Sequence, residues 1–123
     1  MRSIMQLLVV GGLLLGGAGV VLAHEGETGA NKTVTGEVVD VACYLGHGAT
    51  GMKHADCGKK CVLGGLPVAI KVGKTLYFAV SKDHQSMNAQ LAPWVGHQVQ
   101  ATGEVSERDE EHLIAISDVK ALD

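Results

Sequence analysis

The segment 43–67, CYLGHGATGMKHADCGKKCVLGGLP, constrains this chain more than any other stretch, because it holds all three cysteines of the sequence. Runs in which apolar and polar residues alternate, the pattern of half-buried strands, lie on both sides of it. A loop longer than about 12–15 residues in a compact domain is usually functional or disordered, and cysteines at fixed spacing argue against disorder. We therefore expect a small β scaffold that presents a long, chemically reactive loop.

Residues 1–23 have the pattern of a cleavable export signal. Arg2 provides the positive charge, an apolar run follows it, and the sequence VLA that ends at Ala23 fits a small-x-small cleavage site. The alternative is an uncleaved anchor, because the apolar run is about long enough to span a bilayer. We expect cleavage after Ala23, a periplasmic or secreted protein, and no membrane contact once the signal is removed.

The remaining chain is short and mildly acidic. We expect a flexible polar leader at 24–32 and one domain at 33–123. Of the ten Lys and Arg residues, nine remain after Arg2 is removed, against thirteen Asp and Glu. An acidic domain is a poor partner for nucleic acid. A base-stacking surface is also excluded, because the chain has only four aromatic residues, Tyr44, Tyr77, Phe78 and Trp94.

The alternation predicts five strands, at 33–43, 66–72, 75–80, 97–105 and 112–119. Gly73-Lys74 is predicted to form a two-residue hairpin turn, and a short helix that ends at Pro93 is predicted between the third and fourth strands. The acidic stretch SERDEE at 106–111 is predicted to be a loop. Asp40 interrupts the apolar pattern near the cysteine-rich loop. It either accepts hydrogen bonds behind the ligands or lies at the barrel mouth, and we favour the barrel mouth.

This order of elements, β-β-β-α-β-β, together with the closing segment VGHQVQATGEVSERDEEHLIAISDVKAL, resembles small exported bacterial domains of the OB-fold type. The resemblance implies a mainly β protein, a five-stranded Greek-key barrel over about residues 33–120. It places segment 43–67 in the loop between the first two strands, which is a ligand-binding loop of that fold. It implies nothing specific about function, because such folds serve many functions.

Within the loop, residues 54–63 are predicted to form a short helix that ends at Gly64-Gly65. His54, Cys57 and Cys61 are then spaced i, i+3 and i+7, within a stripe about 60° wide. Cys43, at the end of the first predicted strand, is expected to close over them. One imidazole and three thiolates are the donors of a Cys₃His tetrahedral metal site.

Thiolates are soft ligands, which favour Cu(I) or Zn(II), and we favour copper over zinc. Met52 and His47 are alternate ligands in the same segment. The C-x₃-C spacing is similar to that of exported copper-handling proteins. Lys59 and Lys60 are expected to lower the pKa values of the thiols, which would favour the thiolate form.

A disulfide is the principal alternative to a metal, because exported cysteines often pair. Cys43 bonded to Cys57 or Cys61 would staple the loop to the barrel, worth roughly 3 kcal/mol in the chain-entropy model. The protein would then be a structural or interaction module of a cell-envelope complex. A thiol–disulfide enzyme is the third alternative. Three cysteines cannot all pair in one chain and His54 shares their predicted helix face, so we favour a metal-binding accessory or chaperone-type protein that is not an enzyme.

Overall fold

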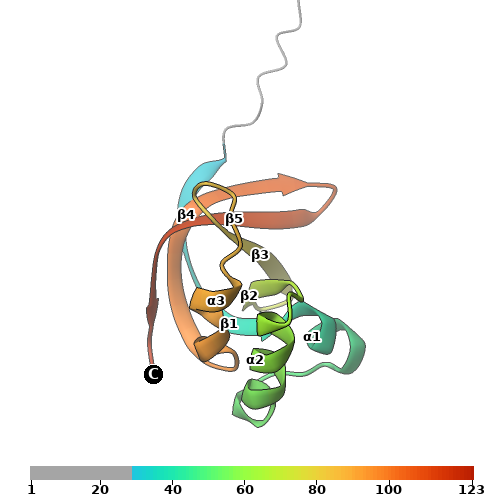
Figure 1. Cartoon of the computed structure of the whole chain (residues 1–123). Helices are drawn as coiled ribbons and strands as arrows, with labels where there is room; N and C mark the ends of the chain where they lie inside the picture. Colours follow the sequence, from blue (N-terminus) through green and yellow to red (C-terminus); the bar gives the residue numbers. More distant parts are fainter. Residues whose placement is uncertain (1–28) are drawn as a thin grey trace, which may run out of the picture.

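The computed structural model describes residues 29–123, so the predicted signal and residues 24–28 of the predicted leader lie outside the described residues. The described chain forms a closed five-stranded β-barrel with several short helices (Figure 1). Its strands are β1 (Ala30–Asp40), β2 (Val68–Val72), β3 (Thr75–Ser81), β4 (Gln98–Arg108) and β5 (Glu111–Ala121). The prediction of a mainly β, OB-like barrel is confirmed.

The short helices lie in two connections. Between β1 and β2 come α1 (Val41–His47), η1 (Met52–His54) and α2 (Ala55–Leu63), and between β3 and β4 come α3 (Asn88–Leu91) and η2 (Ala92–Trp94). Figure 1 shows α1 and α2 together at one end of the barrel, with the turn between β4 and β5 at the other. No helix among residues 29–123 is long and apolar enough to cross a membrane.

The barrel closes in the order β1-β2-β3-β5-β4, with β4 returning to pair with β1. The β3–β5 pair is parallel, and the other four pairs of the described barrel are antiparallel. The long strand β1 serves two neighbours: its first part pairs with β4 and its last part with β2. Gly36 lies where the partner changes, and a Cβ there would overlap the carbonyl of Lys71. Glycine thus permits the close approach that bends β1 between two neighbours.

The barrel interior is filled by aliphatic side chains. The largest fully buried ones include Ile70, Leu91, Ile114, Val38 and Val99. Each contributes about 1.5–3 kcal/mol by its removal from water. A second, smaller cluster forms on the outside of β1 and β2, where Val39, Val41 and Ala69 pack under Tyr44, Leu76 and Phe78.

Several element boundaries differ from the sequence-based expectations. The first strand begins at Ala30, inside the predicted leader, because Ala30–Lys32 pair with Val105–Gly103 of β4. The predicted acidic loop is reduced to a two-residue turn at Asp109-Glu110, where both residues have positive φ, and the flanking residues extend β4 and β5. The Gly73-Lys74 turn lies where it was predicted, between β2 and β3.

Candidate metal centre

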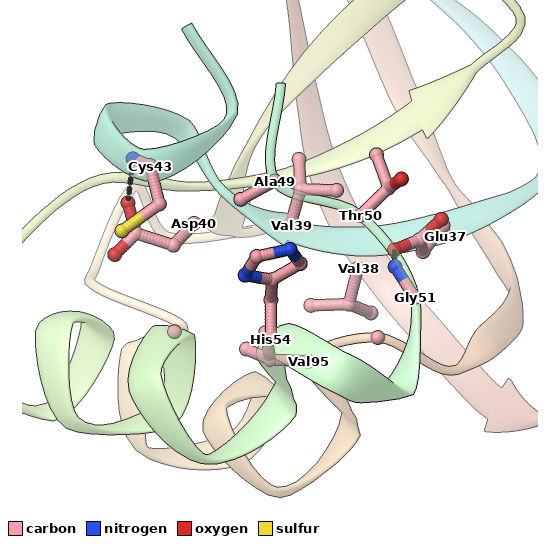
Figure 2. A pocket seen from close by; sticks show the side chains of 12 residues that line it. Glu37, Val38, Val39, Asp40, Cys43, Ala49, Thr50, Gly51, His54 and Val95 are labelled. Carbon is pink, nitrogen blue, oxygen red and sulfur yellow. Dashed lines mark hydrogen bonds between the residues drawn. The ribbon is translucent and has the colours of Figure 1, made fainter. Parts of the chain in front are cut away.

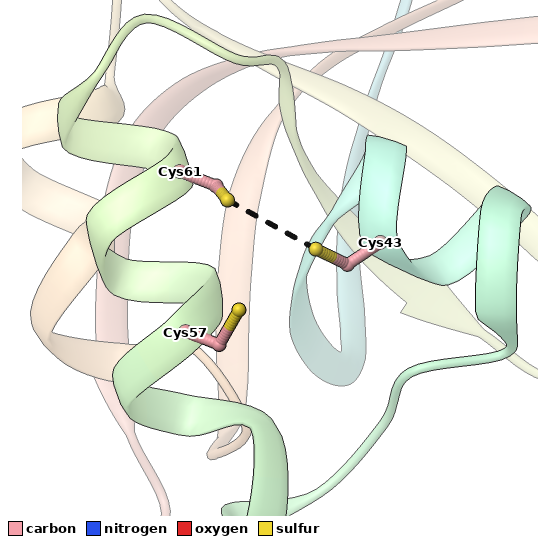
Figure 3. Close-up of side chains that lie close together, drawn as sticks. All are labelled: Cys43, Cys57 and Cys61. Atoms are coloured by element: carbon pink, nitrogen blue, oxygen red, sulfur yellow. Dashed lines mark hydrogen bonds between the residues drawn. The ribbon is translucent and has the colours of Figure 1, made fainter.

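The three cysteines converge on one point beside the barrel (Figure 3). Cys43 comes from α1, and Cys57 and Cys61 lie one turn apart on α2. Their three Sγ atoms all lie within 4.8 Å of one another, and the Sγ atoms of Cys43 and Cys61 are 4.0 Å apart. All three are free thiols, and no disulfide joins them. Among residues 29–123 this is the one such group of His, Cys, Asp or Glu ligand atoms.

Cys43 is placed by a helix cap. The predicted first strand was expected to run to Cys43, but it ends at Asp40, whose Oδ1 accepts a hydrogen bond from the Cys43 backbone N–H at 3.0 Å. This capping bond, worth about 1 kcal/mol, turns the chain into α1. Gly48, with φ of 68°, ends the helix and donates its N–H to the carbonyls of Cys43 and Tyr44. Cys43 therefore lies in the first turn of a short helix, not on a strand.

Cys57 and Cys61 are placed by the packing of α2 against the barrel. Gly58 is buried, and a Cβ at this position would lie 2.6 Å from Cγ1 of Val95 and 3.5 Å from Cβ of Asp40. The backbone of α2 can approach Val95 this closely only because residue 58 has no side chain. Val62 is fully buried on the same helix. With this face packed inward, the two cysteines point toward Cys43.

The C-terminal end of α2 is held by one side chain from α3. Nδ2 of Asn88 donates to the carbonyl oxygens of Val62 and Leu66, at 2.8 and 2.9 Å. These bonds satisfy carbonyls at and just beyond the helix end, which have no partner within the helix. They fix the end of α2 that carries Cys61.

His54 does not join the three sulfurs. The predicted helix was expected to begin at His54, but α2 begins at Ala55, and His54 instead ends η1 with φ of −108° and ψ of 1°. The i, i+3, i+7 stripe is therefore broken at its first member. In Figure 2 the imidazole lies below Val39 and Ala49, beside a small hollow that it shares with Asp40 and Cys43. Its nitrogens are not among the atoms that lie within 4.8 Å of one another.

The two alternate ligands are also placed apart from the sulfurs. His47 is exposed at the end of α1, and its nitrogens are outside the group. Met52 lies on η1 with 59 % of its surface exposed. The three cysteines are thus the part of the proposed ligand set that the fold brings together, and the full ligand set stays a prediction.

Asp40 is the residue that the sequence analysis undervalued. Asp40 is only 3 % exposed, and its Oδ2 is buried with no hydrogen-bond partner apart from the nearby Cys61 thiol. A thiol is a weak donor, so it replaces little of the interaction with water that this oxygen has lost. A cation would remove that cost. The sequence signal for this role is an acidic residue that interrupts an apolar strand three positions before a cysteine.

The electrostatic environment of the thiols is opposite to the one predicted. The Asp40 carboxylate next to the Cys61 thiol, together with burial, raises the pKa of Cys61 to about 12. Burial, with the nearby Asp40 charge, also raises the pKa of Cys43. The expectation that Lys59 and Lys60 would lower these pKa values is wrong for both thiols, because burial and the Asp40 carboxylate set the direction of both shifts and neither lysine contributes to them. Metal binding therefore has to displace protons from Cys43 and Cys61.

No protein-family model, curated protein or solved structure matches the chain. Function therefore has to be inferred from the chemistry of the site.

Proposed function

We propose that this protein is an exported metal-binding protein that takes up one soft metal ion, Cu(I) in preference to Zn(II), on Cys43, Cys57 and Cys61, for delivery or storage. The observation that carries the proposal is the convergence of three sulfur atoms, within 4.8 Å of one another, from two separate helices. The buried Oδ2 of Asp40 next to them is a second, independent sign that a positive charge belongs there.

The donor set favours a soft ion. Thiolates prefer Cu(I) and Zn(II) over hard ions such as Mg²⁺ or Ca²⁺. Three sulfurs are sufficient for Cu(I), which is stable in a trigonal thiolate site. A structural zinc site nearly always has four ligands. With three sulfurs assembled, copper is the ion that the cysteines alone can satisfy.

Exposure of the site favours an exchangeable ion over a permanent structural one. Cys57 is exposed, while Cys43 and Cys61 are half-buried. A donor or acceptor can therefore reach the ion at Cys57 and exchange ligands stepwise. The barrel core is built from aliphatic side chains and contains none of the proposed metal ligands, so we expect the barrel to fold without the metal. Export rests on the signal pattern of residues 1–23.

The direct test is an anaerobic titration of reduced protein with Cu(I) against a chromophoric Cu(I) chelator. We expect one equivalent of Cu(I) per chain. Cys43→Ser, Cys57→Ser and Cys61→Ser should each lower the affinity by at least about tenfold, because each removes one of three ligands. His47→Ala is the matched control and should bind as the wild type does. Wild-type protein that takes up no Cu(I), or cysteine variants that bind it as tightly as the wild type, would refute the proposal.

One observation also supports a second candidate, a disulfide-stapled interaction module of the cell envelope. The Sγ atoms of Cys43 and Cys61 are 4.0 Å apart, so a disulfide between them would need little movement of α1 or α2. The bond would join α1 to α2 and leave the exposed Cys57 thiol for a partner protein. Counting free thiols in native, metal-stripped protein separates the two candidates: one thiol supports the staple, and three thiols that a metal protects support the metal site.

A further inference from the structure

We propose that Asp40 supplies a fourth, oxygen donor to the ion held by the three cysteines, and that it thereby sets which metal the site accepts. The inference rests on the proposed function and deepens it. Asp40 makes the site competent also for a divalent ion such as Zn(II), in a Cys₃Asp arrangement, and thereby narrows the preference of the three cysteines for Cu(I).

The Asp40 carboxylate has no partner outside the two helices that carry the cysteines. Its Oδ1 accepts from the backbone N–H of Cys43, and its Oδ2 has no hydrogen-bond partner apart from the nearby Cys61 thiol, a weak donor. No Lys, Arg or His among residues 29–123 forms an ion pair with it, since the two pairs in this range are His97–Asp123 and His112–Glu107. A buried charge is tolerated in proteins when it is paired or bound to a metal.

The second step is location. Asp40 precedes Cys43 by three residues, and the capping bond holds its carboxylate beside that side chain (Figure 2). From the other side α2 approaches at Gly58, the residue next to Cys57. Asp40 thus lies at the junction of the two helices that carry the sulfurs.

The third step is the separation of the sulfur atoms, which is close to the separation that coordination needs. Zn–S bonds of about 2.3 Å imply tetrahedral S···S separations of about 3.8 Å. The Cys43–Cys61 separation of 4.0 Å is already close to this value. Since all three Sγ atoms lie within 4.8 Å of one another, the remaining contraction is about 1 Å or less.

The charge balance gives the metal preference. Three thiolates and a carboxylate together carry more negative charge than one ion neutralises. In a site partly removed from water, the uncompensated charge is larger with monovalent Cu(I) than with divalent Zn(II). The carboxylate also gives Zn(II) its fourth ligand, which Cu(I) does not need. Asp40 therefore strengthens zinc binding and weakens copper binding.

The discriminating variant is Asp40→Asn. Asparagine keeps a side-chain oxygen that can cap α1 and nearly the same shape, but removes the negative charge. We expect the Zn(II) affinity, measured by chelator competition, to fall about 10–100-fold, and the Cu(I) affinity to stay the same or rise. The visible absorption bands of the Co(II)-substituted protein should shift, because an oxygen donor is lost. His54→Ala, the matched control, should leave both affinities and the Co(II) bands unchanged.

Three results would overturn the inference while leaving Cu(I) binding by the cysteines intact. If Asp40→Asn binds Zn(II) with wild-type affinity, Asp40 caps α1 and is not a metal ligand. Loss of Zn(II) binding in His54→Ala instead would assign the fourth place to the imidazole. Wild-type protein that binds Cu(I) but no Zn(II) would remove the fourth ligand altogether. Failure of wild-type protein to bind Cu(I) tests the proposed function instead.

A measurement on the wild type covers the case in which Asp40→Asn fails to fold. X-ray absorption of the zinc-loaded protein should give three sulfur ligands at about 2.3 Å and one light ligand at about 2.0–2.2 Å. The outer-shell scattering of an imidazole should be missing. Four sulfur ligands, shared between two chains, or a clear imidazole pattern would overturn the inference.

Discussion

The barrel differs in its construction from the segment 41–67, which we call the helical insertion. The barrel is closed and apolar inside, whereas the insertion gathers polar and reactive side chains. In the barrel, β4 closes on β1 and leaves no free sheet edge, and the interior is aliphatic. The helical insertion joins the barrel through a small residue, a cap and one asparagine. It gathers three free thiols next to the buried Asp40 carboxylate. The difference indicates that stability resides in the barrel and chemistry in the insertion.

The largest effect on stability is therefore expected in the barrel. Ile70 is fully buried, and Ile70→Ala should lower the free energy of unfolding by about 2–5 kcal/mol, through lost burial and a cavity. Urea denaturation measures the loss. Leu45→Ala, at a side chain 69 % exposed on α1, is the control and should change stability by less than about 0.5 kcal/mol. The folded fraction of Ile70→Ala should still bind Cu(I) with wild-type affinity. A loss of Cu(I) affinity in the folded fraction would contradict the assignment of stability to the barrel and chemistry to the helical insertion.

The next largest effect is expected where the two regions touch. In Gly58→Ala the new Cβ would lie 2.6 Å from the Val95 side chain, so α2 must shift outward. We expect a loss of about 1–3 kcal/mol from overpacking and weaker Cu(I) binding, because Cys57 and Cys61 move with the helix. Thermal unfolding and chelator competition report the two effects.

Gly46→Ala is the matched control for that substitution. Gly46 is in α1, and nothing lies within 4 Å of a Cβ added there. Alanine is a better helix former than glycine, so this variant should be neutral or more stable by up to about 1 kcal/mol. If Gly58→Ala and Gly46→Ala have the same stability and the same Cu(I) affinity, the close packing at residue 58 does not position Cys57 and Cys61.

A smaller effect is expected at the end of α2. Asn88→Ala removes the two hydrogen bonds to the carbonyls of Val62 and Leu66. The expected loss is about 1 kcal/mol of stability, with faster amide hydrogen exchange in the last turn of α2 than in β1. Gln90→Ala, at an exposed position of the same short helix, should show neither change. Unaltered exchange in Asn88→Ala would mean that the end of α2 is held by packing alone.

The last comparison involves no mutation and no change in stability. The thiolate is the form that reacts with alkylating agents, and the pKa of Cys61 is raised to about 12. Below that pKa the thiolate fraction of Cys61 rises about tenfold per pH unit. In metal-free protein at about pH 8, the exposed Cys57 should therefore be alkylated first, and Cys43 and Cys61 should react only as the pH is raised. Peptide mass spectrometry after timed alkylation identifies the order in which the cysteines react. Fast labelling of Cys61 at neutral pH would show that Asp40 does not suppress the reactivity of this thiol.

Much of the barrel could be predicted because its signals are local. Alternation of apolar residues marks strands wherever one face is buried, and Gly73 supplies the positive φ, 59°, that a two-residue turn requires. The spacing of Cys57 and Cys61 is equally local, since residues four apart share a helix face. The two boundary errors near the site come from helix ends. A capping bond from Asp40 places Cys43 in a helix instead of a strand, and α2 begins at Ala55, one residue later than predicted.

The sequence by itself determined the kind of chemistry: three cysteines and few other reactive groups, in one long loop between two strands of a small β protein. Only the tertiary structure decided which groups meet. Asp40 and Cys61 are far apart along the chain, and they become neighbours because α2 packs its glycine against Val95 and the end of β1. That contact sets the charge around the thiols, which no local pattern encodes, because a pKa depends on burial and on charges brought close by folding.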